Sequence, residues 1–104
     1  MTKPSIFEIL QLLSKAKDGQ RQKICDDILT LLQKQPDDAK QKDKAGWTPL
    51  HTACYFRAPL DVVAALLQVW PDSVKEKNRS GWTPLHIACS FRTPLEAVAA
   101  LLEV

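Results

Sequence analysis

The chain has 104 residues, of which 45% are hydrophobic and 25% charged, and its formal net charge is +2. This is the length and composition of one soluble domain with a core, and so small a net charge gives no reason to expect a nucleic-acid partner. No apolar stretch reaches membrane-spanning length, and Glu8 and Gln11 interrupt the N-terminal apolar run, which argues against a signal peptide. We therefore expect an intracellular protein, cytoplasmic or nuclear, with no membrane partner.

The first 35 residues predict two helices. Ser5 and Glu8 have the spacing of a capping box, apolar residues follow, and Gly19 supplies a stop, so we expect the first helix over about residues 5–16. A second apolar pattern, with charged residues on its other side, aligns with the outer helix of the later repeats. We interpret residues 1–35 as a degenerate N-terminal capping repeat.

The rest of the chain is a tandem repeat. The letters GWTPLH occur at residues 46–51 and again at 81–86, and laying residues 36–69 over 71–104 matches 22 of 34 positions. Self-similarity at such a period indicates a solenoid, in which each unit buries its apolar face only against a neighbour. We expect two repeats that fold alike and stack on each other.

Each repeat predicts two helices and an extended connection. A hydroxyl at Thr48 suits a helix N-cap and Pro49 the position after it, and Thr83 begins the same pattern one repeat later. Pro59 should close this inner helix and open the outer one, which Pro71 should end. Between units, basic residues alternate with others up to a glycine, which predicts an extended, solvated, strand-like finger.

With these motifs in register twice, the chain resembles the ankyrin repeat family. The resemblance implies an all-α fold, a short ankyrin-type helix-turn-helix solenoid with extended finger loops between repeats, in which the fingers and inner helices form a concave face. The units are a 35-residue variant of a repeat that usually has about 33 residues, and their loops lack the glycine that the family usually places at a helix end. The expected units are 1–35, the repeat 36–70, and the repeat 71–104, truncated at its C-terminal end, together forming one domain. The motif residues are Thr48, Pro49, Leu50, His51, Thr83, Pro84, Leu85 and His86.

Two histidine–cysteine pairs could imitate a zinc site. His51 with Cys54 and His86 with Cys89 each have i,i+3 spacing, but a metal needs four converging ligands and stacked units repeat a direction without converging. The resemblance implies that each histidine bonds the backbone and the threonine hydroxyl of its turn. Together with Cys25, the cysteines should face the packing interior, which fits a reducing compartment. We expect no metal, no cofactor, no disulfide and no catalytic activity.

The residues that folding leaves unexplained lie on the fingers and inner helices. Trp47 and Trp82 occupy a variable position of the family pattern and could form an aromatic ridge for a partner, or could stack along the finger row on basic side chains. The finger lysines and arginines could attract an acidic or phosphorylated partner, or could be the solvated side of the fingers. The candidate partner-binding residues are Trp47, Trp82, Lys44, Arg79, Thr52, Tyr55, Ile87 and Ser90.

Three functions from different classes follow. The first is a protein–protein interaction module that binds a protein or peptide on its concave face. The second is a structural segment of a longer scaffold or multidomain protein, with no binding role of its own. The third is a metal or phosphate site built on the histidine–cysteine pairs or the basic fingers.

The packing pattern also makes predictions about the core and the end of the stack. Leu50, Leu66, Leu85 and Leu101 should be almost fully buried, because they recur at helix positions that face a neighbouring unit. The last helix keeps the apolar pattern of an interior one. We expect it to be continued by further repeats, or covered by self-association or a partner.

Overall fold

The computed structural model describes residues 6–90 and 95–102. Its elements in chain order are α1 (Ile6–Leu12), α2 (Asp18–Lys34), η1 (Pro36–Lys40), α3 (Pro49–Tyr55), α4 (Leu60–Val69), η2 (Pro71–Lys75), α5 (Pro84–Ser90) and α6 (Leu95–Leu102), where η denotes a 3-10 helix. These residues contain no β-strand, which confirms the all-α prediction. No helix among them is both long and apolar enough to cross a bilayer.

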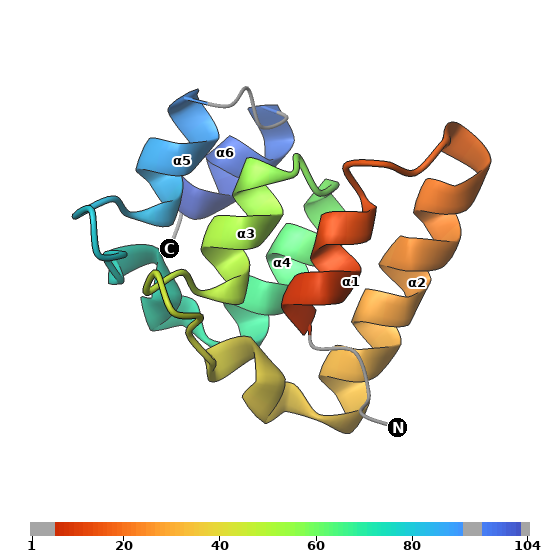
Figure 1. Ribbon diagram of the computed structural model, residues 1–104, viewed down its shortest axis with the longest axis horizontal. Helices are drawn as coiled ribbons and strands as arrows, with labels where there is room; N and C mark the ends of the chain where they lie inside the picture. The colour runs from red at the N-terminus through yellow and green to blue at the C-terminus, as the bar shows by residue number, and fades with distance from the viewer. Residues whose placement is uncertain (1–5, 91–94, 103–104) are drawn as a thin grey trace.

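The helices form two layers of a short solenoid (Figure 1). The inner helix α3 lies between α1 and α5, the outer helix α4 lies between α2 and α6, and the two helices of each unit pack on each other. We call residues 35–48, between α2 and α3, the first finger, and residues 70–83, between α4 and α5, the second finger. Both fingers lie at the same edge of the stack.

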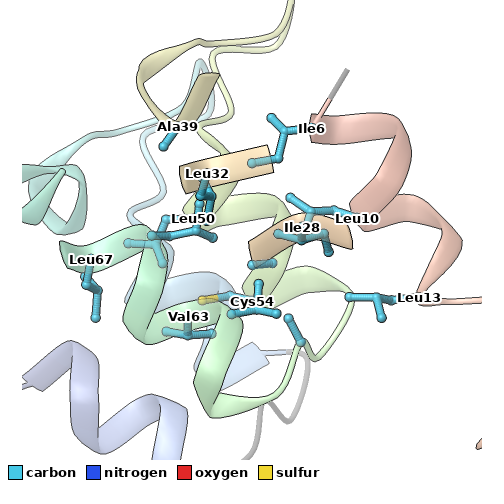
Figure 2. Packing of buried hydrophobic residues seen from close by; sticks show 14 of the residues in the cluster. Ile6, Leu10, Leu13, Ile28, Leu32, Ala39, Leu50, Cys54, Val63 and Leu67 are labelled. Atoms are coloured by element: carbon cyan, nitrogen blue, oxygen red, sulfur yellow. The ribbon is translucent and has the colours of Figure 1, made fainter. Parts of the chain in front are cut away.

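The core fills the space between the layers. Figure 2 shows apolar side chains of α1 to α4 gathered there, among them Leu50 of α3, which is 1% exposed. Leu66 and Leu101 are buried as predicted, but Leu85 is only half-buried, so the prediction of full burial is wrong for that residue. The difference arises because Leu50 lies on a helix flanked by α1 and α5, whereas α5 has an inner-helix neighbour on one side only in the described chain.

Both inner helices of the repeats begin where the sequence predicts. Thr48 is the N-cap of α3, its hydroxyl accepts a hydrogen bond from the His51 backbone N–H at 3.2 Å, and Pro49 is the first helical residue. The Thr83 hydroxyl accepts the equivalent bond from the His86 backbone at 3.4 Å. The cap satisfies one of the donors that a helix start leaves open.

The end of α3 differs from the prediction that Pro59 closes it. The helix stops at Tyr55, and Arg57 takes the left-handed conformation with φ +56°. The N–H of Ala58 then bonds the Ala53 carbonyl at 2.9 Å, which is the Schellman arrangement that glycine usually makes. Pro59 serves only as the N-cap of α4. Arg57 therefore occupies the helix-end position where glycine is usual, and its left-handed conformation costs on the order of 1–2 kcal/mol.

Two further expectations need correction. The first helix covers residues 6–12, shorter than the predicted 5–16, and Gly19 lies in the first turn of α2 and is not a helix stop; Ser5 lies outside the described residues. After Leu12 the chain turns through i to i−3 bonds, so no glycine is required. The fingers are not extended throughout, because each begins with a 3-10 helix, η1 or η2.

Candidate functional site

The tip of the first finger is a turn held by Asp43. Its carboxylate oxygen Oδ1 accepts hydrogen bonds from the backbone N–H groups of Ala45 and Trp47, each at 2.9 Å. Gly46 has φ +78°, a conformation that glycine adopts without strain. The turn fixes the backbone from which the Trp47 side chain projects.

The second finger repeats this turn with an amide in place of the carboxylate. Oδ1 of Asn78 accepts from the N–H groups of Ser80 and Trp82 at 2.9 and 3.0 Å, and Gly81 has φ +82°. Neither Asp43 nor Asn78 is among the site residues predicted from the sequence. The signal was present, because an aspartate or asparagine that bonds the backbone shortly ahead of it is typical of turns, and one stands four residues before each tryptophan.

The two fingers are joined to each other. The Arg79 backbone N–H donates to the Ala45 carbonyl at 2.9 Å, and Lys42 Nζ lies 2.6 Å from a carboxylate oxygen of Glu76. Gly46 is also a point of close approach, since a Cβ atom there would lie 3.1 Å from the Arg79 nitrogen. The spacing between the tips is thus set by backbone contacts.

His51 joins the second finger to the inner helix. Its Nδ1 accepts from the Thr48 backbone N–H at 3.2 Å, so Nε2 carries the proton and donates to the Trp82 carbonyl at 2.8 Å. Burial of the ring lowers the pKa of His51 below its ordinary value, against the opposing effect of the bond to that carbonyl. The neutral imidazole therefore fixes the position of Trp82. His86 makes the same bonds within its own turn.

Aromatic side chains gather on the face next to the fingers. Trp47 meets Tyr55 edge to face, with ring centroids 5.4 Å apart, and Tyr55 meets Phe56 in the same way at 5.0 Å. Tyr55 and Trp82 are each 38% exposed, and Trp47 is half-buried. Each of these three rings is therefore at least partly exposed, and the aromatic face includes Tyr55 of α3 as well as the two indoles.

Two adjoining grooves lie along these rings. The first, of about 270 Å³, runs between α1 and α3; its walls include Phe7, Gln11 and Asp43 together with Trp47 and Tyr55. The second, of about 260 Å³, we call the Trp47–Trp82 groove. It is lined by Trp47, Tyr55, Asn78, Ser80, Trp82 and Ile87. The two grooves share Trp47 and Tyr55, so they form one continuous surface over neighbouring units.

Comparison with known protein families identifies the fold. A family model described as ankyrin repeats, three copies, matches residues 8–104. The chain belongs to the ankyrin repeat family. No curated protein and no solved structure matches it significantly. Ankyrin repeats are generally protein–protein interaction modules, and the family is typically non-enzymatic.

The remaining candidate residues of this ankyrin domain differ in access. Lys44, Arg79 and Ser90 are exposed. Thr52 is 6% exposed and Ile87 2%, so each can contribute only to the floor of a groove. The variation between repeats at these two positions changes the groove floors, whereas the variation at Tyr55 and Ser90 changes exposed surface.

The cysteines follow the prediction in part. Cys25 and Cys54 are buried thiols, and burial raises the pKa of Cys54 to about 12. Cys89 is exposed, so the expectation that it faces the interior is wrong. Cys54 lies on α3, between two neighbouring inner helices, and Cys89 on α5, which has one such neighbour among the described elements. Among the described residues, no three His, Cys, Asp or Glu side chains are grouped to hold a metal ion.

Proposed function

We propose that this ankyrin domain binds a protein or peptide on its concave face, at the surface formed by the two grooves, and that Trp47, Tyr55 and Trp82 contribute most of the contact. The observation that carries the proposal is the exposed aromatic surface shared by the grooves. Aromatic residues are enriched among the residues that dominate binding energy at interfaces. The family's general role supports the same class of function.

The size of the effect can be estimated for Trp82. A tryptophan offers roughly 150–250 Å² of contact area, and 38% of Trp82 remains exposed. Covering that fraction, on the order of 80 Å², would stabilise a complex by about 2 kcal/mol. This is the gain expected of a residue that dominates an interface, and the core does not require it.

The finger geometry supports a preformed site. The Ala45–Arg79 bond, the Lys42–Glu76 ion pair and the His51–Trp82 bond hold the groove walls before any partner arrives. A surface that is ordered in advance loses less conformational freedom on binding. The alternative, a structural segment without a binding role, does not explain why these aromatic rings are exposed.

The test is partner capture with substituted tryptophans. Partners crosslinked to the purified chain should be lost in the double variant Trp47→Ala, Trp82→Ala, while its far-UV circular dichroism stays that of the parent. Trp70→Ala is the matched control, because Trp70 lines neither groove and the same side chain is removed. Capture that survives the double variant, or that fails equally in Trp70→Ala, would show that the grooves are not the binding surface.

A separate contact is supported at α6. Leu95 is 82% exposed and Leu102 66%, which is unusual for large apolar residues on one helix. We propose that a second copy of the chain covers this face. Sedimentation should then show concentration-dependent association that Leu95→Lys with Leu102→Glu abolishes. A parent chain that stays monomeric at high concentration would refute it. An intracellular location is likewise a proposal, supported by the odd number of cysteines, three, of which Cys25 and Cys54 are buried.

A further inference from the structure

The basic and acidic groups of the fingers are not equivalent. At the finger tips, residues 42–47 and 76–82, both acidic groups are engaged, because Asp43 is bonded within its turn and Glu76 is paired with Lys42. The other finger carboxylates, Asp37, Asp38 and Asp72, belong to η1 and η2. Within residues 6–90 and 95–102, no carboxylate lies at ion-pair distance from the side chains of Lys44, Lys77 or Arg79. The finger tips, with four basic residues against two acidic ones, therefore offer a net positive charge to a partner.

This charge lies beside the Trp47–Trp82 groove. Arg79 stands between Asn78 and Ser80, which both line the groove, and Lys77 precedes them. Lys44 belongs to the turn that carries Trp47. The same finger tips thus supply both the aromatic walls and the cations.

Asn78 adds a directed donor. The residue is only 7% exposed, and its Oδ1 is used twice in the turn. Its Nδ2 donates to no acceptor among the described residues and is not fully buried. The residue lines the groove, so this N–H group can reach a ligand there. An amide nitrogen in this position donates to an oxygen. The equivalent residue of the first finger, Asp43, lines the other groove and can only accept.

The interior of the groove is apolar. Ile87 forms its floor, and the rings of Trp47, Tyr55 and Trp82 form its walls. Its volume of about 260 Å³ suits one aliphatic side chain of a peptide crossing the fingers. The basic side chains and the Asn78 amide then lie at the edge of the Trp47–Trp82 groove, where neighbouring residues of that peptide would pass.

We infer that the ligand of this groove is an extended acidic peptide segment, whose aliphatic side chain sits between Trp47 and Trp82. Its carboxylates face Lys44, Lys77 and Arg79, and one oxygen accepts from Nδ2 of Asn78. This inference rests on the proposed function and specifies the chemistry of the partner. A charge-assisted hydrogen bond to the amide is the contact that selects acid over amide or base.

The experiment uses three labelled synthetic peptides in fluorescence anisotropy titrations. One has a leucine between flanking aspartates, the second has lysines for the aspartates, and the third has alanine for the leucine. The first should bind the parent chain, and more weakly as salt is raised. Trp82→Ala should weaken its binding by about thirtyfold. The second should not bind. The third should bind with about one tenth of the affinity of the first or lower, because the aliphatic contact is lost.

Asn78→Asp is the decisive variant. The turn should survive, because Asp43 holds the same turn in the first finger, and circular dichroism checks that it does. The variant should bind the aspartate peptide about tenfold more weakly, the value of one hydrogen bond to a charged group. The matched variant Asp43→Asn should not weaken binding.

Three results would overturn the inference: equal or better binding of the lysine peptide, no binding of any peptide, or an Asn78→Asp affinity equal to that of the parent. None of them touches the broader proposal, which stands or falls on whether partner capture depends on Trp47 and Trp82. A chain that captures partners through those residues but ignores the aspartate peptide has a binding surface of different chemistry.

Discussion

Replacing Gly46 with alanine tests whether the fingers are held by backbone contact. An alanine there must adopt φ near +78°, a left-handed conformation that costs about 1–2 kcal/mol. Its Cβ would also lie 3.1 Å from the Arg79 nitrogen and 3.3 Å from the Asn78 Cα, which are backbone atoms that cannot rotate away. Shifting them stretches the Ala45–Arg79 hydrogen bond, with a net value of about 0.5–1.5 kcal/mol.

Gly81→Ala is the matched control. Its φ of +82° imposes the same conformational penalty, but nothing lies within 4 Å of an added Cβ. In urea unfolding followed by circular dichroism, Gly46→Ala should lose about 2–3 kcal/mol and Gly81→Ala about 1–2 kcal/mol. Equal losses would mean that the fingers do not restrain each other and that the groove is not preformed.

Three further predictions concern stability. Stability should fall as pH is lowered from about 6.5, because the pKa of His51 is lowered in the folded chain and the unfolded chain therefore takes up a proton first. The fall should stop below the pKa of the folded chain. In thermal melts across pH, this dependence of melting temperature on pH should disappear in His51→Gln and persist in His86→Gln. Leu50→Ala should lose about 2–5 kcal/mol and the half-buried Leu85→Ala less than about 2, and equal losses in denaturant would contradict the burial difference. Arg57→Gly should gain about 0.5–1 kcal/mol by relieving a non-glycine φ of +56°, and a lower melting temperature than the parent would count against it.

Local chemistry made part of the fold predictable. A hydroxyl followed by proline marks the start of α3 and α5, because both features act within one turn of the chain. The histidine bonds to the threonine turn followed from the family resemblance. The burial of Leu50 followed from the helical period.

The two wrong burial predictions have a common physical cause: the sequence of a repeat does not show how many neighbouring helices it will have in the stack. Leu85 and Cys89 occupy the same repeat positions as Leu50 and Cys54, but the number of neighbouring helices differs, so their burial differs. The end of α3 was missed because the left-handed residue is Arg57, and an arginine gives no local signal for that conformation.

The candidate site was predictable in its aromatic residues and missed in its polar ones. Trp47 and Trp82 stood out because no core required them, and both line a groove. Asp43 and Asn78 were hidden, because their roles depend on turn geometry and on the contact between fingers. The difference between a carboxylate in one turn and an amide in the other is therefore a structural finding.

The most direct test of the binding surface is the NMR signal of the indole N–H groups. The chain has three tryptophans, of which Trp47 and Trp82 line the groove and Trp70 does not. When a captured partner or the aspartate peptide is titrated in, the signals of Trp47 and Trp82 should shift together while that of Trp70 stays in place. Saturable binding that moves Trp70 alone, or leaves both groove tryptophans unmoved, would contradict the account.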